Sequence, residues 1–191
     1  YLFTNYFLLS HIHQKKSKTC FAVLAKADCI FFLDFYAMKR IESLGEDIKK
    51  LNHPFVSVMI DHHREPEYFT DYVLWNDKAS STAELVYEFI GLANGLEYMD
   101  EKIASCIYGG MAMDTGIFQY SNTTAKVHLV AAALMEFGIN IEEIHNNVYN
   151  QYGENRMRFI GYLLSEKMVV LPENKTAYMS ISMQEAERYK L

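Results

Sequence analysis

Two apolar segments of this sequence end in side chains that can bind a metal ion or carry a proton. Asp34 follows the run CIFFL, and Asp61 follows VSVMI and is continued by His62 and His63. A strand is ordinarily followed by a turn residue such as Gly or Asn. Either acid alone would be explained as a loop cap, but the pair with two attached histidines favours a functional site.

A third acid, Asp114, ends the segment GGMAMD. By itself Asp114 indicates no more than the C-terminal end of a helix. The preceding Gly109 and Gly110 each weaken a helix by about 1 kcal/mol relative to Ala, which predicts close backbone approach. Alongside the other two acids, Asp114 becomes a candidate metal ligand.

These residue types predict a particular metal chemistry. Carboxylates and imidazoles without thiolates suit a borderline-to-hard divalent cation such as Mn²⁺ or Mg²⁺. Two such ions about 3.5–4 Å apart can polarise a phosphoryl oxygen and generate hydroxide near neutral pH. One carboxylate must bridge the two ions, because cations that close repel each other strongly.

The elements that would position these side chains predict an α/β fold with a parallel sheet flanked by helices. We expect strands at residues 29–33, 55–60 and 72–75, and helices at 20–26 and 42–51. In an open parallel sheet, ligands bind outside the carboxyl ends of the strands, and neighbouring strand ends lie about 5 Å apart. The acids that follow the first two strands could therefore share one metal ion.

Helices dominate after residue 80, and a hairpin closes the chain. Helix starts and ends are marked by Ser81 with Glu84 (a capping-box pattern), Asp100, Gly116, Thr124 and Gly138. Two amphipathic segments follow, IEEIHNNVYNQ and ENRMRFIGYLLSEK, and then MVVLP and TAYMSIS predict a hairpin. We predict a catalytic domain at residues 1–165, and a linker with the start of a second, α+β domain at residues 166–191.

Composition narrows the function classes. The net charge of −6 argues against long duplex nucleic acid as a partner, because an acidic chain would repel it. Three irregularly spaced cysteines argue against a disulfide framework and for a cytoplasmic location. No apolar run approaches the roughly 20 residues that cross a bilayer, and residues 1–10 lack the flanks of a signal peptide, so we expect no membrane partner.

Three stretches of the sequence resemble the DHH phosphoesterases. They are FFLDFYAMKRI, MIDHHREPEYFTDYVLWNDKASSTAELVYEFI and YGGMAMDTGIFQYSNTT. The resemblance extends from about residue 28 to the hairpin. It is to the branch of short-oligoribonucleotide hydrolases that also remove phosphate from 3′-phosphoadenosine 5′-phosphate.

The resemblance implies a role for each candidate residue. Asp34 is similar to the family's metal-bridging carboxylate, His62 to a metal ligand, and Asp114 to the second shared carboxylate. Asp61 resembles a supporting acid that orients the histidines, and His63 the group that faces the substrate phosphate; both are predicted catalytic residues. The implied cofactor is a pair of Mn²⁺ ions, with Mg²⁺ or Co²⁺ as alternatives.

Further residues resemble parts of the family's substrate pocket. Ser80, Ser81 and Thr82 are at positions that line the family's substrate pocket, although a capping box explains these residues equally well. Arg40 falls where the family has an arginine, and an exposed helix charge is the alternative. Residues 122–124 recur beside the family's site, and a helix start explains them too. The implied substrate is a short oligonucleotide or a nucleoside bisphosphate, and a homodimer is left open.

The sequence also departs from the family pattern. The His-x-x-Pro-Asp-Gly-Asp-Ala type motif does not precede Asp34; His11 and His13 lack neighbouring acids, and we interpret them as solvated. Tyr36 stands where this branch commonly has asparagine, and Gln119 where a relative often has arginine. We expect the first motif and most of the C-terminal domain to lie in the parent protein outside this chain, and little activity from the chain alone.

The leading hypothesis is therefore a metal-dependent phosphoesterase acting through water activated by two metal ions. Within enzymes, the alternative is a manganese-dependent inorganic pyrophosphatase, which the Ser-Ser-Thr-Ala-Glu surroundings resemble less. In another class, the alternative is a catalytically inactive remnant that binds a nucleotide or a partner.

Overall fold

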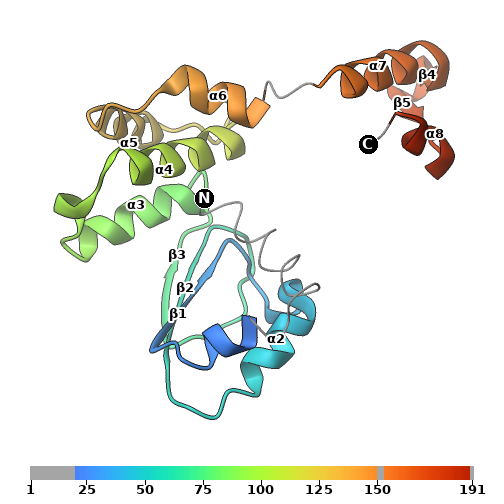
Figure 1. The fold of residues 1–191 in the computed structure, drawn as a ribbon. Helices are drawn as coiled ribbons and strands as arrows, with labels where there is room; N and C mark the ends of the chain where they lie inside the picture. Colours follow the sequence, from blue (N-terminus) through green and yellow to red (C-terminus); the bar gives the residue numbers. More distant parts are fainter. Residues whose placement is uncertain (1–19, 150–152, 190–191) are drawn as a thin grey trace. The chain divides into compact units, whose positions relative to one another are not determined.

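The computed structural model describes residues 20–149 and 153–189, and the chain forms two compact units, Tyr1–His145 and Asn146–Leu191 (Figure 1). The predictions for His11, His13 and residues 1–10 lie outside the described residues. No helix within the described ranges is both long and apolar enough to cross a membrane.

The first unit contains a three-stranded parallel sheet. Its strands β1 (Cys29–Leu33), β2 (Val56–Asp61) and β3 (Tyr72–Trp75) lie in the order β1-β2-β3, so β2 is central. All three predicted strands are present, and β2 is buried along most of its length, as expected for a strand covered on both faces. The predicted α/β fold class is confirmed.

The two faces of the sheet are covered by different helices. Phe32 and Met59 pack against the side chains of η1 (Met38–Ile41) and α2 (Glu42–Lys49). Val58 and Ile60 face the other way and pack with Leu85 of α3 (Thr82–Leu92). The alternation follows from the two-residue period of a strand. This packing on both faces of the sheet holds the carboxyl ends of β1 and β2 at one edge of the core.

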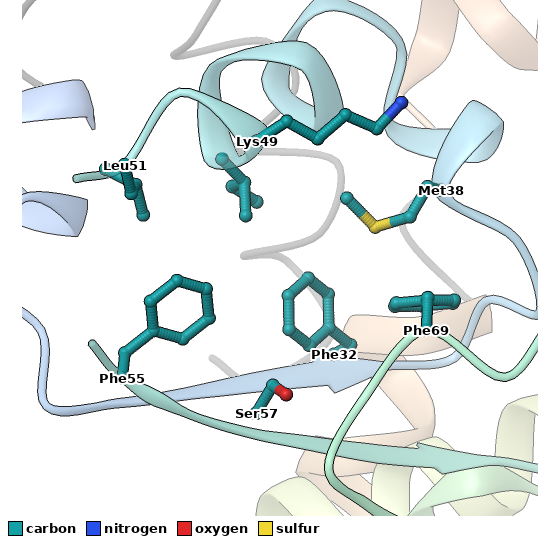
Figure 2. A pocket seen from close by; sticks show the side chains of 8 residues that line it. Phe32, Met38, Lys49, Leu51, Phe55, Ser57 and Phe69 are labelled. Atoms are coloured by element: carbon teal, nitrogen blue, oxygen red, sulfur yellow. The ribbon is translucent and has the colours of Figure 1, made fainter. Parts of the chain in front are cut away.

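An apolar pocket of about 300 Å³ lies on the α2 side of the sheet (Figure 2). It is lined by Phe32, Met38, Ile48, Lys49, Leu51, Phe55, Ser57 and Phe69. Lys49 and Ser57 are its polar lining residues; the Lys49 ammonium pairs with Glu46, and the Ser57 hydroxyl donates to Asp71. No candidate catalytic or metal-binding residue lines this pocket, so the predicted chemistry lies elsewhere.

A helical block completes the first unit. It contains α3, η2 (Leu96–Tyr98), α4 (Glu101–Asp114), α5 (Ala125–Met135) and the start of α6 (Ile141–Tyr149), because the boundary between the units falls inside α6, after His145. Its core is formed by fully buried side chains such as those of Ile107, Met111, Val127 and Leu134. Gly109 faces Ile144 of α6, where an added Cβ would have ordinary clearance of 3.5 Å, so the predicted close backbone approach is not required at that glycine.

The predicted helix caps are present, with one correction. Ser81, Asp100 and Thr124 are N-caps whose side chains accept hydrogen bonds from backbone N–H groups. The capping box at Ser81 is only half formed. The Glu84 side chain accepts from the backbone N–H of Ser80 instead of Ser81.

Helix α4 ends in an unusual turn. Gly116 has a left-handed φ of 56°, and the backbone N–H of Ile117 donates to the carbonyl of Ala112. This pattern ends a helix, as the sequence predicted for Gly116. The left-handed conformation then continues through Ile117 (φ 56°) and Phe118 (φ 61°), which is rare for bulky residues.

The second unit contains the predicted antiparallel hairpin of β4 (Met168–Leu171) and β5 (Thr176–Met179), joined through η4 (Pro172–Asn174). It also contains α7 (Glu154–Tyr162), η3 (Leu163–Lys167) and α8 (Met183–Arg188). Helix α8 was not predicted; it begins at a full capping box formed by Ser182 and Glu185. None of the described residues of this unit is fully buried.

The unit boundary differs from the domain boundary expected after residue 165. Helix α7 lies in the same unit as the hairpin, and its aromatic side chains pack against Tyr189, the residue that follows α8. The rings of Phe159 and Tyr162 lie 5.2 and 5.6 Å from the ring of Tyr189. These contacts join α7 to the residues beyond the hairpin.

Candidate metal centre

The site lies where β1 and β2 end. Leu33 and Ile60 are paired in the parallel register, so Asp34 and Asp61 follow at the same edge. The backbone N–H of Asp34 donates to the carbonyl of Ile60 over 3.1 Å. Asp34 itself has a left-handed φ of 67°, which turns the chain out of the sheet. Such a conformation costs free energy and is found more often at functional sites.

His62 lies between two carboxylates from distant parts of the chain. Its Nε2 is 3.7 Å from Oδ1 of Asp34 and 3.8 Å from Oδ2 of Asp114, at the end of α4. These distances are too long for hydrogen bonds. Two ligand atoms that each bind an ion at roughly 2.1 Å are separated by about 3–4 Å, so the spacing fits a shared cation.

The orientation of His62 supports the same interpretation. Its Nδ1 lies 3.4 Å from the carbonyl oxygen of Ala79, which can hold the proton on that nitrogen. The Nε2 lone pair then points toward the two carboxylates. A metal-binding histidine usually has such a partner on its other ring nitrogen.

His63 also belongs to this cluster. Ligand atoms from Asp34, His62 and His63 all lie within 4.8 Å of one another, the one such group of three found among residues 20–149 and 153–189; Asp114 is not in that group, although its Oδ2 lies 3.8 Å from Nε2 of His62. We predicted His63 to face the substrate, and its side chain is 42 % exposed. The geometry is compatible with His63 as a metal ligand and with His63 as the group that faces the substrate.

Asp61 lies beneath the histidines and is fully buried. Its Oδ1 accepts a hydrogen bond from Nδ1 of His63 at 2.7 Å and from the backbone N–H of His62 at 2.9 Å. The other oxygen, Oδ2, has no hydrogen-bond partner among the described residues. The Trp75 indole donates to the carbonyl of His63 over 2.6 Å. Asp61 is thus placed to orient His63, while its catalytic role stays a prediction.

Negative charge accumulates at the site. Burial raises the pKa of Asp114, and the neighbouring Asp34 carboxylate raises it further, while His62 and His63 oppose the shift. Two carboxylates facing one another in a partly buried space repel each other. A cation between them would relieve that repulsion.

The predicted substrate-binding serines are placed differently from the ligands. Ser80 and Ser81 are both fully buried. The Ser80 hydroxyl donates to Glu84 over 2.9 Å, and the Ser81 hydroxyl accepts from the Glu84 backbone N–H. Contact between either hydroxyl and a substrate would require this segment to rearrange.

Arg40 is connected to the site through an aromatic ring. Its guanidinium carbon lies 5.9 Å from the centre of the Tyr36 ring, and that ring is 5.9 Å from the ring of His63. The predicted substrate-binding arginine therefore contacts the Tyr36 ring, which in turn neighbours His63. Its role in binding stays a prediction.

Two residues outside the predicted ligand set contact it. Thr82 donates to Oδ1 of Asp34, and the Asn122 amide donates to the backbone carbonyl of Asp114. Both lie in the stretches that carry the family resemblance, which was the available signal. Thr82 and Asp34 are 48 positions apart, and Asn122 reaches Asp114 across the turn after α4, so neither contact could be predicted from a local pattern.

Comparison with known proteins establishes the family. Residues 3–111 match the DHH family, N-terminal domain, and this chain belongs to that family. Its fold also matches the crystal structure of an exopolyphosphatase-related protein from Bacteroides fragilis, with a TM-score of 0.86 and 32 % sequence identity over 93 % of this chain and 51 % of that one.

Curated relatives narrow the resemblance. The chain is 32 % identical over 133 residues to the bifunctional oligoribonuclease and PAP phosphatase NrnA of Bacillus subtilis, covering 68 % of this chain and 41 % of that protein. It is 35 % identical over 92 residues to the probable NrnA of Streptococcus mutans, covering 48 % and 29 %. The predicted family and branch are confirmed, and the chain spans well under half the length of these relatives.

Proposed function

We propose that the protein is a metal-dependent phosphoesterase that hydrolyses short oligoribonucleotides and 3′-phosphoadenosine 5′-phosphate. The observation that carries the proposal is the convergence of Asp34, His62 and Asp114, with Nε2 of His62 lying 3.7–3.8 Å from each carboxylate. The names of the NrnA relatives supply the substrate class.

The donor set suits Mn²⁺, with Mg²⁺ or Co²⁺ as alternatives. Asp34, His62 and Asp114 would hold the ion, which supplies a Lewis acid and lowers the pKa of bound water. Among the described residues, His63 is the further possible ligand whose atoms lie within 4.8 Å of those of Asp34 and His62, which supports a proposal of one ion at this cluster. The second ion expected for the family therefore belongs to the proposal and needs donors beyond this cluster.

His63 would act on the substrate from beside the ion. The Nδ1–H of His63 donates a hydrogen bond to Oδ1 of Asp61, so Nε2 would be the ring nitrogen that faces a phosphate oxygen. Arg40, which contacts the Tyr36 ring beside His63, would add positive charge for binding the phosphate.

A second candidate is hydrolysis of a phosphoanhydride. The related crystal structure is named for an exopolyphosphatase-related protein. The same carboxylate and imidazole ligands suit pyrophosphate or polyphosphate chemistry, which includes the pyrophosphatase alternative. The substrate panel must therefore include both bond types.

The test uses protein expressed from its full reading frame, supplied with Mn²⁺. We expect mononucleotides to be released from short oligoribonucleotides and phosphate from 3′-phosphoadenosine 5′-phosphate, with little turnover of pyrophosphate or polyphosphate. His62→Ala should lower kcat/KM at least about a hundredfold, because losing a ligand exceeds the 10–100-fold effects of residues behind the ligands.

A matched change is His53→Ala, because His53 is partly buried and bonds to the carbonyl of Ala27, away from the cluster. It should leave kcat/KM near wild type. Wild-type turnover that does not depend on a divalent cation, or an active His62→Ala variant, would refute the proposed site. Preference for polyphosphate would favour the second candidate.

A further inference from the structure

A four-residue segment between β3 and α3 connects the candidate ligands. Residues Ala79, Ser80, Ser81 and Thr82 are all buried, between 0 and 7 % exposed. The segment begins in the loop after β3 and ends at the first residue of α3. It therefore joins the sheet edge that carries two ligands to the helical block that carries the third.

Each candidate ligand is contacted by this segment or through it. Thr82 Oγ1 donates to Oδ1 of Asp34 over 2.8 Å. The Ala79 carbonyl faces Nδ1 of His62 at 3.4 Å.

The contact with the third ligand is indirect. The Asn122 side-chain amide donates to the carbonyl of Ser80 at 3.2 Å and to the carbonyl of Asp114 at 3.1 Å. One side chain therefore ties the C-terminal end of α4 to the segment. The amide of asparagine has two N–H groups, so it can serve both carbonyls at once.

The segment is itself held by a buried carboxylate. Glu84 is 2 % exposed, and its Oε2 accepts hydrogen bonds from both the backbone N–H and the hydroxyl of Ser80. Its Oε1 lies 3.5 Å from the Lys126 ammonium of α5, which balances the buried charge. A buried polar network of this kind restricts the backbone that it contacts.

Asn122 reaches the segment through a strained turn. Gly116, Ile117 and Phe118 all have φ between 56° and 61°. The carbonyl of Thr115 accepts from the N–H groups of Gln119 and Tyr120, which closes the turn. Left-handed backbone costs about 1–2 kcal/mol per non-glycine residue, so a reversal built this way persists only where the surrounding contacts hold it.

We infer that Thr82 and Asn122 are positioning residues, which set the separation of Asp34, His62 and Asp114 through the Ala79–Thr82 segment and thereby tune metal affinity. This inference rests on the proposed metal centre. Thr82 fixes the direction of the Asp34 carboxylate, and Asn122 fixes the end of α4. The spacing of three ligands from three elements then depends on the one buried Ala79–Thr82 segment.

The test measures metal binding in the protein from the full reading frame. Mn²⁺ affinity is measured by isothermal titration calorimetry, and the bound ion is examined by electron paramagnetic resonance. Thr82→Val keeps the shape of the side chain and removes its donor. We expect affinity to fall about 10–100-fold, the range found when a group behind a ligand is lost. Thr82→Ser keeps the hydroxyl and should stay within about threefold of wild type.

Asn122→Ala should weaken binding about tenfold and broaden the bound Mn²⁺ spectrum, because the end of α4 is released.

Thr124→Val is the control matched to Thr82→Val, since it makes the same change at a threonine that caps α5 through the N–H of Val127. It should cost about 1 kcal/mol of stability and leave Mn²⁺ affinity unchanged.

The outcomes separate two failures. If the wild-type protein binds Mn²⁺ but Thr82→Val and Asn122→Ala bind it equally well, the positioning inference is wrong and the metal centre stands. The same conclusion follows if Thr124→Val weakens binding as much as Thr82→Val. If the wild-type protein binds no divalent cation, the metal centre fails and the inference fails with it.

Discussion

At the scale of single residues, the site combines groups that are costly to bring together without a cation. Asp34 and Asp114 flank His62, and burial with the Asp34 charge raises the pKa of Asp114 above 3.8. Asp61 is fully buried, and one of its oxygens has no hydrogen-bond partner in the described part of the chain. These features oppose folding of the metal-free protein and are of a kind concentrated at functional sites.

Replacing Asp114 should separate stability from metal binding. A carboxyl group whose folded-state pKa is raised destabilises the fold once pH exceeds its unfolded value of 3.8. Asp114→Asn should therefore raise the melting temperature of the metal-free protein at pH 7, and the gain should shrink as pH falls toward 3.8. The variant should also lose the increase in melting temperature that Mn²⁺ gives the wild type.

The measurement is differential scanning calorimetry from pH 4 to pH 8, with and without Mn²⁺. Asp100→Asn changes an acid that caps the other end of α4 and is the control. It should keep the Mn²⁺ response. A metal-free Asp114→Asn variant that is less stable than wild type at pH 7 would show that the carboxylate makes favourable contacts outweighing the repulsion.

At the scale of elements, the turn after α4 decides where Asp114 and Asn122 lie. Gly116 has φ +56°, and an added Cβ would lie 2.4 Å from the Tyr120 ring. Gly138 also has a left-handed φ, +76°, but a Cβ there would meet nothing within 4 Å. The two glycines therefore share the backbone requirement and differ in their surroundings.

Gly138→Ala should cost about 1–2 kcal/mol, the penalty of left-handed backbone alone. Gly116→Ala should cost more, because the ring of Tyr120 must also move, and it should weaken Mn²⁺ binding. Urea unfolding of both variants measures the difference. Equal destabilisation would mean that the exposed Tyr120 ring moves away freely, and removing the ring in Gly116→Ala/Tyr120→Ala should bring the cost to that of Gly138→Ala.

Elements were predictable where local chemistry determines them. The apolar runs before Asp34 and Asp61 gave two strands of the sheet, and Ser81, Asp100 and Thr124 gave helix starts. The six-residue helix α8 was not predicted, because so short a helix shows little periodicity.

Candidate ligands were predictable from residue type and strand ends, but the residues that form hydrogen bonds to them were not. The bond from Thr82 to Asp34 joins residues 48 positions apart. The bond from Asn122 to Ser80 depends on left-handed φ at Ile117 and Phe118, which their side chains disfavour locally. Tertiary contacts produce both, so no local pattern could have predicted them.

At the scale of the whole molecule, the two units contain carboxyl groups with opposite responses to pH. In the second unit, Glu185 accepts from the Lys167 ammonium at 2.7 Å and from the Tyr162 hydroxyl, and it caps α8 through Ser182. The Lys167 bond, then the Tyr162 bond, holds the pKa of Glu185 far below its ordinary 4.5. In the first unit the pKa of Asp114 is shifted upward.

The consequence is a test that distinguishes the units within one chain. A carboxyl group with a lowered pKa stabilises the fold above its unfolded value, and that contribution disappears as pH falls below 4.5 toward the folded-state pKa. Glu185→Gln should therefore lower the stability of the second unit at pH 7, with a difference from wild type that shrinks below pH 4.5. Asp114→Asn should instead raise the stability of the first unit at pH 7, and this gain should shrink as pH falls toward 3.8. Nuclear magnetic resonance melting curves for Tyr162 and Tyr108 report the two units separately. A Glu185→Gln effect that is unchanged between pH 7 and pH 3 would show that the carboxylate contributes through shape rather than charge.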